Sequence, residues 1–235
     1  MQPRSRHRRC RWEVTLKAYP PPWCRRGIRI PGSWPVHSRT VGGTEEAAYT
    51  RRLAALGDRR WKQVLDVQVP YRWQLRRTHP GRTLDVGCGL GRNLRALDVG
   101  VGVDHNPDSV AIAKARGYQA WTTTEWPTCP DALPASFDTI LLSHVLEHLD
   151  ADSATQIVQS YLPYLKVGGQ LVLVCPQERG YASDATHVRF LDAGALRSLA
   201  LDLGFRTATS RSFPFPRFVG RLFTYNETWL VARRG

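Results

Sequence analysis

The chain has 235 residues and a formal net charge of +13 at pH 7, which is enough length for one catalytic domain with an extension. Its five cysteines are scattered, without a Cys-x-x-Cys pair or a histidine at ligand spacing, which argues against a disulfide framework and a zinc site. No apolar run approaches the roughly 20 residues that cross a bilayer, and no apolar signal core opens the chain. We therefore expect a cytoplasmic protein without a membrane span.

The excess positive charge lies in the first 43 residues. This segment carries a net charge of +9 and leaves +4 for the remainder, which is an ordinary surface charge. One interpretation is a basic arm that binds nucleic acid or an anionic membrane; the other is a stretch translated from upstream of the true start codon. The excess of arginine over lysine, and the lack of a helical or strand period, favour the second. We expect residues 1–43 to be disordered or mis-started, and no nucleic acid among the partners.

Residues 44–80 are expected to form a helical cap before a catalytic domain at 81–235. Thr44 and the two glutamates after it can cap a first helix. A second helical stretch, from about Arg59 to Arg77, contains Pro70, which should break or kink it. We interpret its aromatic residues mainly as packing against the domain that follows.

A glycine-rich turn follows the first expected strand, Leu84–Val86. Gly87, Gly89 and Gly91 alternate with other residues, which allows a tight turn and a close approach of the backbone to a ligand. An amphipathic helix is expected to begin directly after it. A dinucleotide fingerprint would need a further glycine at position 92, where this chain has Arg92.

Two acidic residues flank this turn. Asp85 would repel the pyrophosphate of a dinucleotide but favour a ligand with positive charge. Asp104 ends a second expected strand, Val99–Asp104, seventeen residues after Gly87. An acid at this place in a doubly wound sheet accepts hydrogen bonds from ribose hydroxyls. The alternative for Asp104 is to cap the next helix, but Asn106 could do so instead.

The rest of the chain alternates strands and helices, which predicts a doubly wound α/β fold with a mostly parallel sheet. The expected helices are Pro107–Arg116, Asp152–Leu165, ended by Gly168 and Gly169, and Asp192–Leu203. The further expected strands are Tyr118–Trp121, Phe137–Ser143, Gln170–Cys175, Phe205–Phe213 and Phe223–Arg233.

Over about residues 60–235 the chain resembles the class I, Rossmann-like S-adenosylmethionine-dependent methyltransferases of the small-molecule type. The resemblance rests on the Asp-x-Gly-x-Gly-x-Gly turn from Asp85, on Phe137-Asp138, on the segment 145–149 and on the segment 165–169. It implies a seven-stranded sheet whose last two strands form an antiparallel hairpin. It also implies S-adenosyl-L-methionine as the cofactor.

The same resemblance assigns cofactor contacts by place in the fold. Glu125 would accept from the adenine amino group, with Trp126 or Trp121 as a stacking wall; the alternative is an exposed loop with a tryptophan over the core. Ser143 would face the methionine half of the cofactor. The full set of predicted cofactor-binding residues is Asp85, Gly87, Cys88, Gly89, Gly91, Asp104, His105, Asn106, Glu125, Trp126 and Ser143.

Two histidines are candidate catalytic residues. His187 lies in a Thr-His-Val-Arg-Phe segment seen in family members and could remove the acceptor proton; the equally weighted alternative is a histidine that braces the loop. His144 follows the strand that ends at Ser143 and could also contact the cofactor. His144 and His148 are four residues apart, which suggests a metal pair. No third ligand is expected nearby, so we expect no metal.

The resemblance implies transfer of a methyl group to a small-molecule hydroxyl, carbon or carboxyl acceptor, chiefly by alignment of acceptor and methyl group. An amine-methylating Asn-Pro-Pro-Tyr motif does not follow Ser143. The alternatives are an RNA or protein methyltransferase that uses the basic arm, a nicotinamide-dependent oxidoreductase and a noncatalytic cofactor-binding protein. Candidate residues for the acceptor pocket are Tyr181, Arg189, Tyr225 and Asn226.

Overall fold

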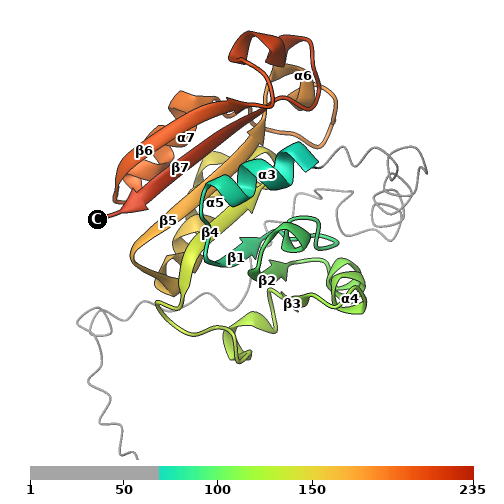
Figure 1. The fold of residues 1–235 in the computed structure, drawn as a ribbon, viewed down its shortest axis with the longest axis vertical. Coiled ribbons are helices and arrows are strands. Elements are labelled where there is room, and N and C mark those ends of the chain that lie inside the picture. Colours follow the sequence, from blue (N-terminus) through green and yellow to red (C-terminus); the bar gives the residue numbers. More distant parts are fainter. Residues whose placement is uncertain (1–68) are drawn as a thin grey trace, which may run out of the picture. The chain divides into compact units, whose positions relative to one another are not determined.

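A computed structural model describes residues 69–235 of the chain (Figure 1). The predictions for the extension at 1–43, for the helix after Thr44 and for the first part of the next helix lie outside the described residues. Within the described part, the strands form one seven-stranded sheet in the order β3-β2-β1-β4-β5-β7-β6. This order confirms the predicted doubly wound fold.

The strands run parallel from β3 to β5, and β7 lies antiparallel between β5 and β6. The C-terminal hairpin of the prediction is therefore present. The strand bounds are β1 (Arg82–Val86), β2 (Val99–Asp104), β3 (Gln119–Thr122), β4 (Phe137–Ser143), β5 (Leu165–Pro176), β6 (Phe205–Phe213) and β7 (Glu227–Arg234).

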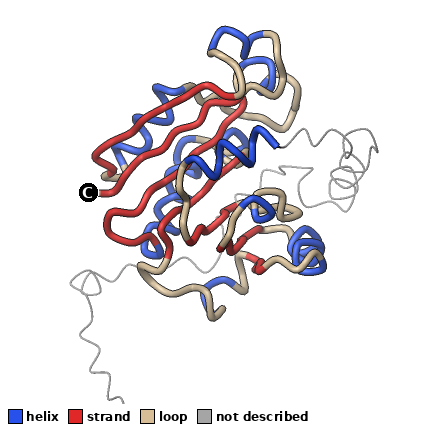
Figure 2. Tube along the Cα trace, in the orientation of Figure 1, coloured by secondary structure: helices blue, strands red, loops and turns tan. Residues whose placement is uncertain are grey.

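Helices cover both faces of the sheet (Figure 2). The α-helices are α3 (Val69–Arg77), α4 (Pro107–Ala115), α5 (Ala151–Tyr161), α6 (Glu178–Tyr181) and α7 (Ala193–Asp202). Single 3₁₀ turns are η2 (Leu94–Ala96), η3 (Trp126–Thr128), η4 (Leu146–His148), η5 (Leu162–Tyr164) and η6 (Arg217–Arg221).

The two faces have separate hydrophobic cores because successive strand residues point to opposite sides. In β4, Ile140 and Leu142 join the core beneath α5 and α7, whereas Leu141 joins the core beneath α3, η2 and α4. All three side chains are fully buried or nearly so. This two-sided burial explains why the central strands read as continuous apolar runs.

The predicted helix directly after the glycine turn is absent, and that prediction is wrong. Only twelve residues, 87–98, connect β1 to β2, and the glycine turn takes up the first part of them. The Asn93 side chain at the start of η2 bonds Asp85 and makes no cap hydrogen bond. Helix α3 covers this short connection instead, and the Arg76 Nε donates to the Ala96 carbonyl at 3.1 Å.

The predicted end of the helix before β5 is also wrong. Helix α5 stops at Tyr161, and β5 already begins at Leu165 and runs through Gly168 and Gly169. Pro163 cannot continue the helix because it lacks an N–H. Gly168 has a φ of +75°, and the pairing of β4 with β5 shifts register beside it, so the two glycines mark an irregular stretch of strand.

The C-terminal end of α3 is hydrogen-bonded to the edge of the sheet at which the parallel strands begin. The Gln170 Nε2 donates to the Thr78 carbonyl at 2.9 Å and to the Thr139 Oγ1 at 3.0 Å, and the Thr139 hydroxyl donates to the Pro80 carbonyl at 2.6 Å. With its C-terminal end held there, α3 crosses the sheet (Figure 1). Its first turn therefore reaches the opposite edge, where the parallel strands end.

Candidate functional site

The glycine turn between β1 and η2 needs glycine at each of its three positions. Gly87, Gly89 and Gly91 have φ angles of +77°, +51° and +80°, a region that L-residues with a Cβ rarely adopt. A Cβ at Gly87 would collide with Val145, and one at Gly91 would lie 2.6 Å from the Tyr118 ring. A Cβ at Gly89 would meet nothing within 4 Å among the described residues, so the backbone there is open to a ligand.

Asp104 ties the end of β2 to this turn. The Gly89 N–H donates to its Oδ2 at 2.7 Å, and the Asn106 N–H donates to its Oδ1 at 2.9 Å. His105 lies beside it, with Nδ1 3.4 Å from the same Oδ1. Since a carboxylate oxygen accepts more than one hydrogen bond, Asp104 can hold the turn and still accept from a ribose hydroxyl.

Asn106 is the N-cap of α4, so Asp104 is not needed to cap this helix. Its Oδ1 accepts from the Asp108 and Ser109 N–H groups at the start of α4. The side chain is buried. Its carbonyl oxygen therefore stabilises the helix start, and the cofactor contact of Asn106 stays a prediction.

Asp85 and Asn93 form a buried polar pair behind the turn. The Asn93 Nδ2 donates to the Asp85 Oδ1 at 3.0 Å. Among the described residues, the Asp85 Oδ2 and the Asn93 Oδ1 have no hydrogen-bond partner. Burial raises the pKa of Asp85 to about 7. Two unpartnered acceptor oxygens fit a positively charged donor such as an ammonium group.

The same features do not suit a pyrophosphate. A carboxylate lies behind the turn, and the turn leads into a single 3₁₀ turn, η2, rather than into an α-helix. The N-terminal dipole that binds phosphate in dinucleotide enzymes is therefore not provided here. Asn93 was not among the predicted site residues, although its place two residues after the third glycine could have suggested it.

The end of β3 gives one exposed and one buried candidate. The Glu125 side chain is about half exposed, and its Oε2 accepts from the Thr122 N–H at 2.8 Å. Trp126 is only 3% exposed and packs against Phe137 and Tyr164 in the core on the α5 side. The predicted stacking role of Trp126 is therefore wrong, because the 3₁₀ turn that begins there directs the ring into the core.

Ser143, at the end of β4, bonds to helix α3. Its Oγ lies 2.8 Å from the Tyr71 hydroxyl. The Tyr71 ring packs against Trp229 with centroids 4.9 Å apart, and the Arg92 guanidinium lies 5.2 Å from its centroid. Burial raises the pKa of Tyr71, so the hydroxyl keeps its proton. Tyr71 is thus a residue of the site edge, which the sequence did not indicate beyond a packing role.

His144 is held between two carboxylates. Its Nδ1 lies 3.1 Å from the Glu147 Oε1, and its Nε2 lies 2.8 Å from the Glu227 Oε1. Burial opposes the charged ring, but the two carboxylates outweigh it and raise the pKa of His144 to about 9. A charged imidazole that donates to both partners has no lone pair for a proton. Carboxylates therefore engage both ring nitrogens of His144, and Glu227, distant in sequence, was missed. The catalytic role of His144 stays a prediction.

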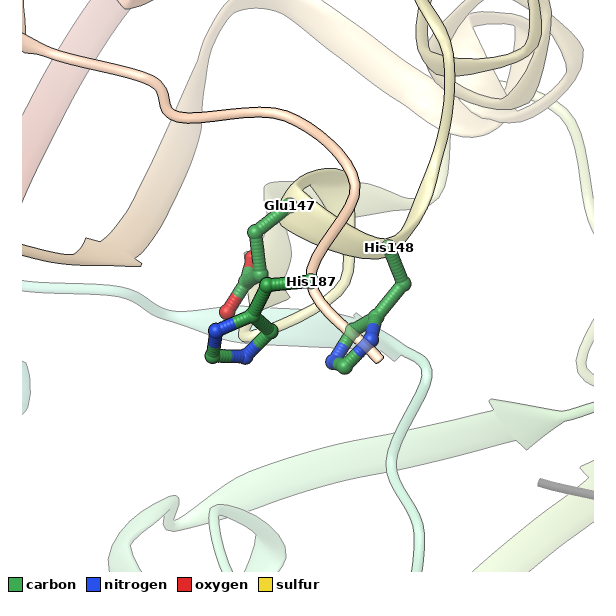
Figure 3. A group of neighbouring side chains, drawn as sticks. All are labelled: Glu147, His148 and His187. Carbon is green, nitrogen blue, oxygen red and sulfur yellow. The ribbon is translucent and has the colours of Figure 1, made fainter. Parts of the chain in front are cut away.

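Glu147, His148 and His187 form a cluster at the same edge (Figure 3). One potential ligand atom of each lies within 4.8 Å of the others. The first two residues belong to η4, and His187 belongs to the loop after α6, which the Glu147 carbonyl fastens by accepting from the Val188 and Arg189 N–H groups. The premise that no third ligand lies near His148 is therefore wrong, because the fold brings His187 to it.

The two histidines of this cluster are oriented by main-chain carbonyls. The His148 Nδ1 is 3.2 Å from the Thr186 carbonyl oxygen and 3.2 Å from the Thr186 Oγ1, whose hydrogen goes to the Asp184 Oδ1. The His187 Nδ1 is 2.8 Å from the Tyr181 carbonyl oxygen. A carbonyl only accepts, so each Nδ1 carries the proton. The hydrogen bond and charge of His144 outweigh burial and lower the pKa of Glu147, which keeps this carboxylate ionised.

The predicted acceptor-pocket residues divide into two groups. The Tyr181 ring stacks on His187 with centroids 5.4 Å apart, Arg189 is half-buried in the same loop, and Tyr225 is exposed. Asn226 is fully buried and bonds Gln177 and the Phe215 N–H. It therefore braces the connection between β6 and β7 and does not line a pocket.

None of the helices in the part of the chain that the structure describes is long and apolar enough to cross a membrane. No curated protein matches the chain. Among solved structures, a methyltransferase from Thermotoga maritima is 18% identical with a TM-score of 0.60, covering 80% of this chain and 98% of that one. One from Archaeoglobus fulgidus is 20% identical with a TM-score of 0.56, covering 70% and 93%.

A third structure is the magnesium protoporphyrin IX methyltransferase of Synechocystis with bound S-adenosylhomocysteine, at 18% identity and a TM-score of 0.51, with 80% of this chain and 98% of that chain covered. At these identities the likeness shows the fold. The family model described as a methyltransferase domain matches residues 51–210, more than half of the chain. The chain therefore belongs to this methyltransferase family and has the fold of the class I S-adenosylmethionine-dependent enzymes.

Proposed function

We propose that this protein transfers the methyl group of S-adenosyl-L-methionine to a small-molecule acceptor at the edge of the sheet where the parallel strands end. The observation that carries the proposal is the open backbone at Gly89, held by Asp104 and backed by the Asp85–Asn93 pair. The cofactor supplies an activated sulfonium methyl group. The protein has to bind, align and dehydrate the two reactants.

Each end of the cofactor has a matching group. Asp104 would accept from the ribose hydroxyls, and the unpartnered oxygens of Asp85 and Asn93 would accept from the ammonium. Asp85 is fully buried, and Arg92 lies close enough to lower its pKa against the effect of burial. Glu125 remains the proposed partner of the adenine amino group.

The acceptor would bind beside η4 and the loop after α6. Tyr181 stacks on His187, the Phe190 ring packs edge-on against Tyr181, and Val188 is exposed beside them. Aromatic and aliphatic surface at a site edge favours an acceptor with an apolar or aromatic body. The related Synechocystis enzyme is named for a small-molecule acceptor, which supports the same class here.

The cofactor part of this proposal is tested by calorimetry with S-adenosylhomocysteine and the full chain. Asp104→Asn should lower the affinity at least about tenfold, since a lost hydrogen bond to a charged group is worth roughly 1.5–3 kcal/mol. Asp98→Asn is the matched control, because Asp98 is exposed and precedes the other end of β2. Binding of NAD instead, or no effect of Asp104→Asn, would overturn the proposal.

The acceptor class is tested with S-adenosylmethionine that carries a labelled methyl group. The protein is incubated with the label and with separated small-molecule, RNA and protein fractions of a cell extract. Label that moves into the small-molecule fraction supports the proposal. Label that moves into RNA or protein contradicts it and returns the basic segment 1–43 to consideration.

A further inference from the structure

The geometry points to a divalent transition-metal site formed by Glu147, His148 and His187, at which an acceptor hydroxyl is bound and activated. This inference rests on the proposed methyl transfer for its chemistry, but the metal site itself does not depend on that proposal. It goes beyond the sequence, which separates the third ligand from the other two by almost forty residues.

The first argument is the placement of the ligand atoms. One ligand atom of each of the three side chains lies within 4.8 Å of the other two, a spread that ligands about 2.0–2.2 Å from one ion can adopt with small side-chain rotations. The three side chains point to the same side of the loop pair (Figure 3). A single ion could therefore contact all three.

The second argument is the unpartnered carboxylate oxygen. Glu147 is fully buried, and its Oε1 is used by His144. Its Oε2 has no hydrogen-bond partner within residues 69–235. A buried, ionised oxygen without a partner is costly, and a cation would satisfy it.

The third argument is the orientation of the rings. Because each Nδ1 donates to a main-chain carbonyl, of Thr186 or Tyr181, the Nε2 of each neutral ring carries the lone pair that can bind an ion. Histidines that bind metals almost always have their second nitrogen fixed in this way. Within the described part of the chain, no hydrogen bond to either Nε2 is present.

The ligand set selects the class of ion. Two imidazole nitrogens and one carboxylate suit first-row transition ions such as Mn²⁺, Co²⁺ and Zn²⁺, whereas Mg²⁺ and Ca²⁺ prefer oxygen ligands. Three protein ligands leave coordination positions open for a substrate.

The site would change how the acceptor reacts. A hydroxyl that binds a divalent ion loses its proton more readily, and here the proton would leave to solvent. The oxygen lone pair then forms the new bond to the sulfonium methyl carbon, and the carbon–sulfur bond breaks with its electron pair on sulfur. The products are the methyl ether, neutral S-adenosylhomocysteine and one proton, so atoms and charge balance.

The test is Co²⁺ and Zn²⁺ binding to the full, untagged chain after removal of metal with a chelator. Calorimetry and the visible absorption of Co²⁺ are the readouts. We expect one site that is stronger than any other, and we expect His187→Asn, His148→Gln and Glu147→Gln each to weaken it about 100-fold or more, beyond what outer-shell partners cost. His79→Asn, at an exposed histidine with a φ of +50°, should leave it unchanged.

The same samples separate this inference from the proposed function. Each variant is also titrated with S-adenosylhomocysteine, and its folding is followed by circular dichroism. If Glu147→Gln does not fold, the metal affinity of His187→Asn decides the result, because His187 is partly exposed. Metal binding that all folded variants retain, or its absence from the parent chain while S-adenosylhomocysteine still binds, overturns the metal site alone. Failure to bind S-adenosylhomocysteine contradicts the proposed function alone.

Discussion

The cofactor half and the acceptor half of the site are built in different ways. The cofactor half, at the ends of β1 and β2, consists of backbone turns held by residues close in sequence, with Gly89 bonded to Asp104 and Asp85 bonded to Asn93. The acceptor half lies where β4 and β5 end and β7 begins. It joins side chains from distant segments, such as His144 to Glu227 and His148 to His187.

The two halves of the site are therefore stabilised by different interactions. The cofactor half depends on glycine conformations that no other residue adopts cheaply, so its geometry is fixed by the backbone. The acceptor half depends on buried charges and hydrogen bonds, which can change without altering the sheet. Substitutions in the cofactor half should therefore act through backbone strain, and substitutions in the acceptor half through lost charges and hydrogen bonds.

The largest effect is expected at Gly87, where the cofactor half has no room for an added Cβ. Gly87→Ala introduces both a positive-φ strain of about 1–2 kcal/mol and a collision with Val145 that costs about 1–3 kcal/mol. Gly117→Ala is the matched control, because Gly117 has a φ of +86° but nothing within 4 Å of its added Cβ among the described residues.

Urea unfolding of both variants measures the difference. Gly87→Ala should lose about 2–5 kcal/mol and bind S-adenosylhomocysteine poorly, whereas Gly117→Ala should lose only the strain. Equal losses would mean that the turn tolerates a side chain and that its backbone does not fix the cofactor half.

A second test uses the charge in the cofactor half. The pKa of Asp85 is raised to about 7 by burial, so between about pH 4 and 7 the folded protein holds a proton that the unfolded chain releases. Stability from this group therefore falls as the pH rises through that window. Asp85→Asn removes this dependence and can still accept from Asn93.

The unfolding free energy of Asp85→Asn, relative to the parent chain, should rise by about 2–3 kcal/mol between pH 5 and pH 8. At pH 8 the same variant should bind S-adenosylhomocysteine more weakly, since the negative charge for the ammonium is lost. A pH-independent difference in stability would show that Asp85 is not the group that titrates.

A third test asks whether the acceptor half is held by its buried charges. Glu227→Gln removes the carboxylate that accepts from His144 and from the Trp229 Nε1, and should cost about 1–3 kcal/mol. Glu178→Gln is the control, because Glu178 pairs with Arg217 at the surface, where ion pairs are worth about 0–1 kcal/mol. Thermal and urea unfolding give both values; equal values would mean that burial adds nothing at Glu227.

The smallest effect is expected at the contact between α3 and β4. A double-mutant cycle of Tyr71→Phe and Ser143→Ala should give a coupling of about 0.5–1.5 kcal/mol in the unfolding free energy, from their 2.8 Å hydrogen bond. Zero coupling would mean that the first turn of α3 is not fixed to the sheet by this bond.

The sequence by itself determined the sheet, the glycine turn and Asp104. These features follow from apolar strand runs, from glycine spacing and from an acid at a strand end, all of which are local along the chain. The relation of the glycine turn to Asp104 follows from their places at the ends of neighbouring strands, whereas Asn93, the partner of Asp85, was missed.

Only the tertiary structure decided which polar groups meet. The structure has η2 where a helix was expected after the glycine turn, because only twelve residues connect β1 to β2. The Trp126 ring is packed in the core. The fold also brought Glu227 to His144 and His187 to His148. The physical reason is that parallel strands from separate parts of the chain end at one edge, so sequence distance no longer predicts contact there.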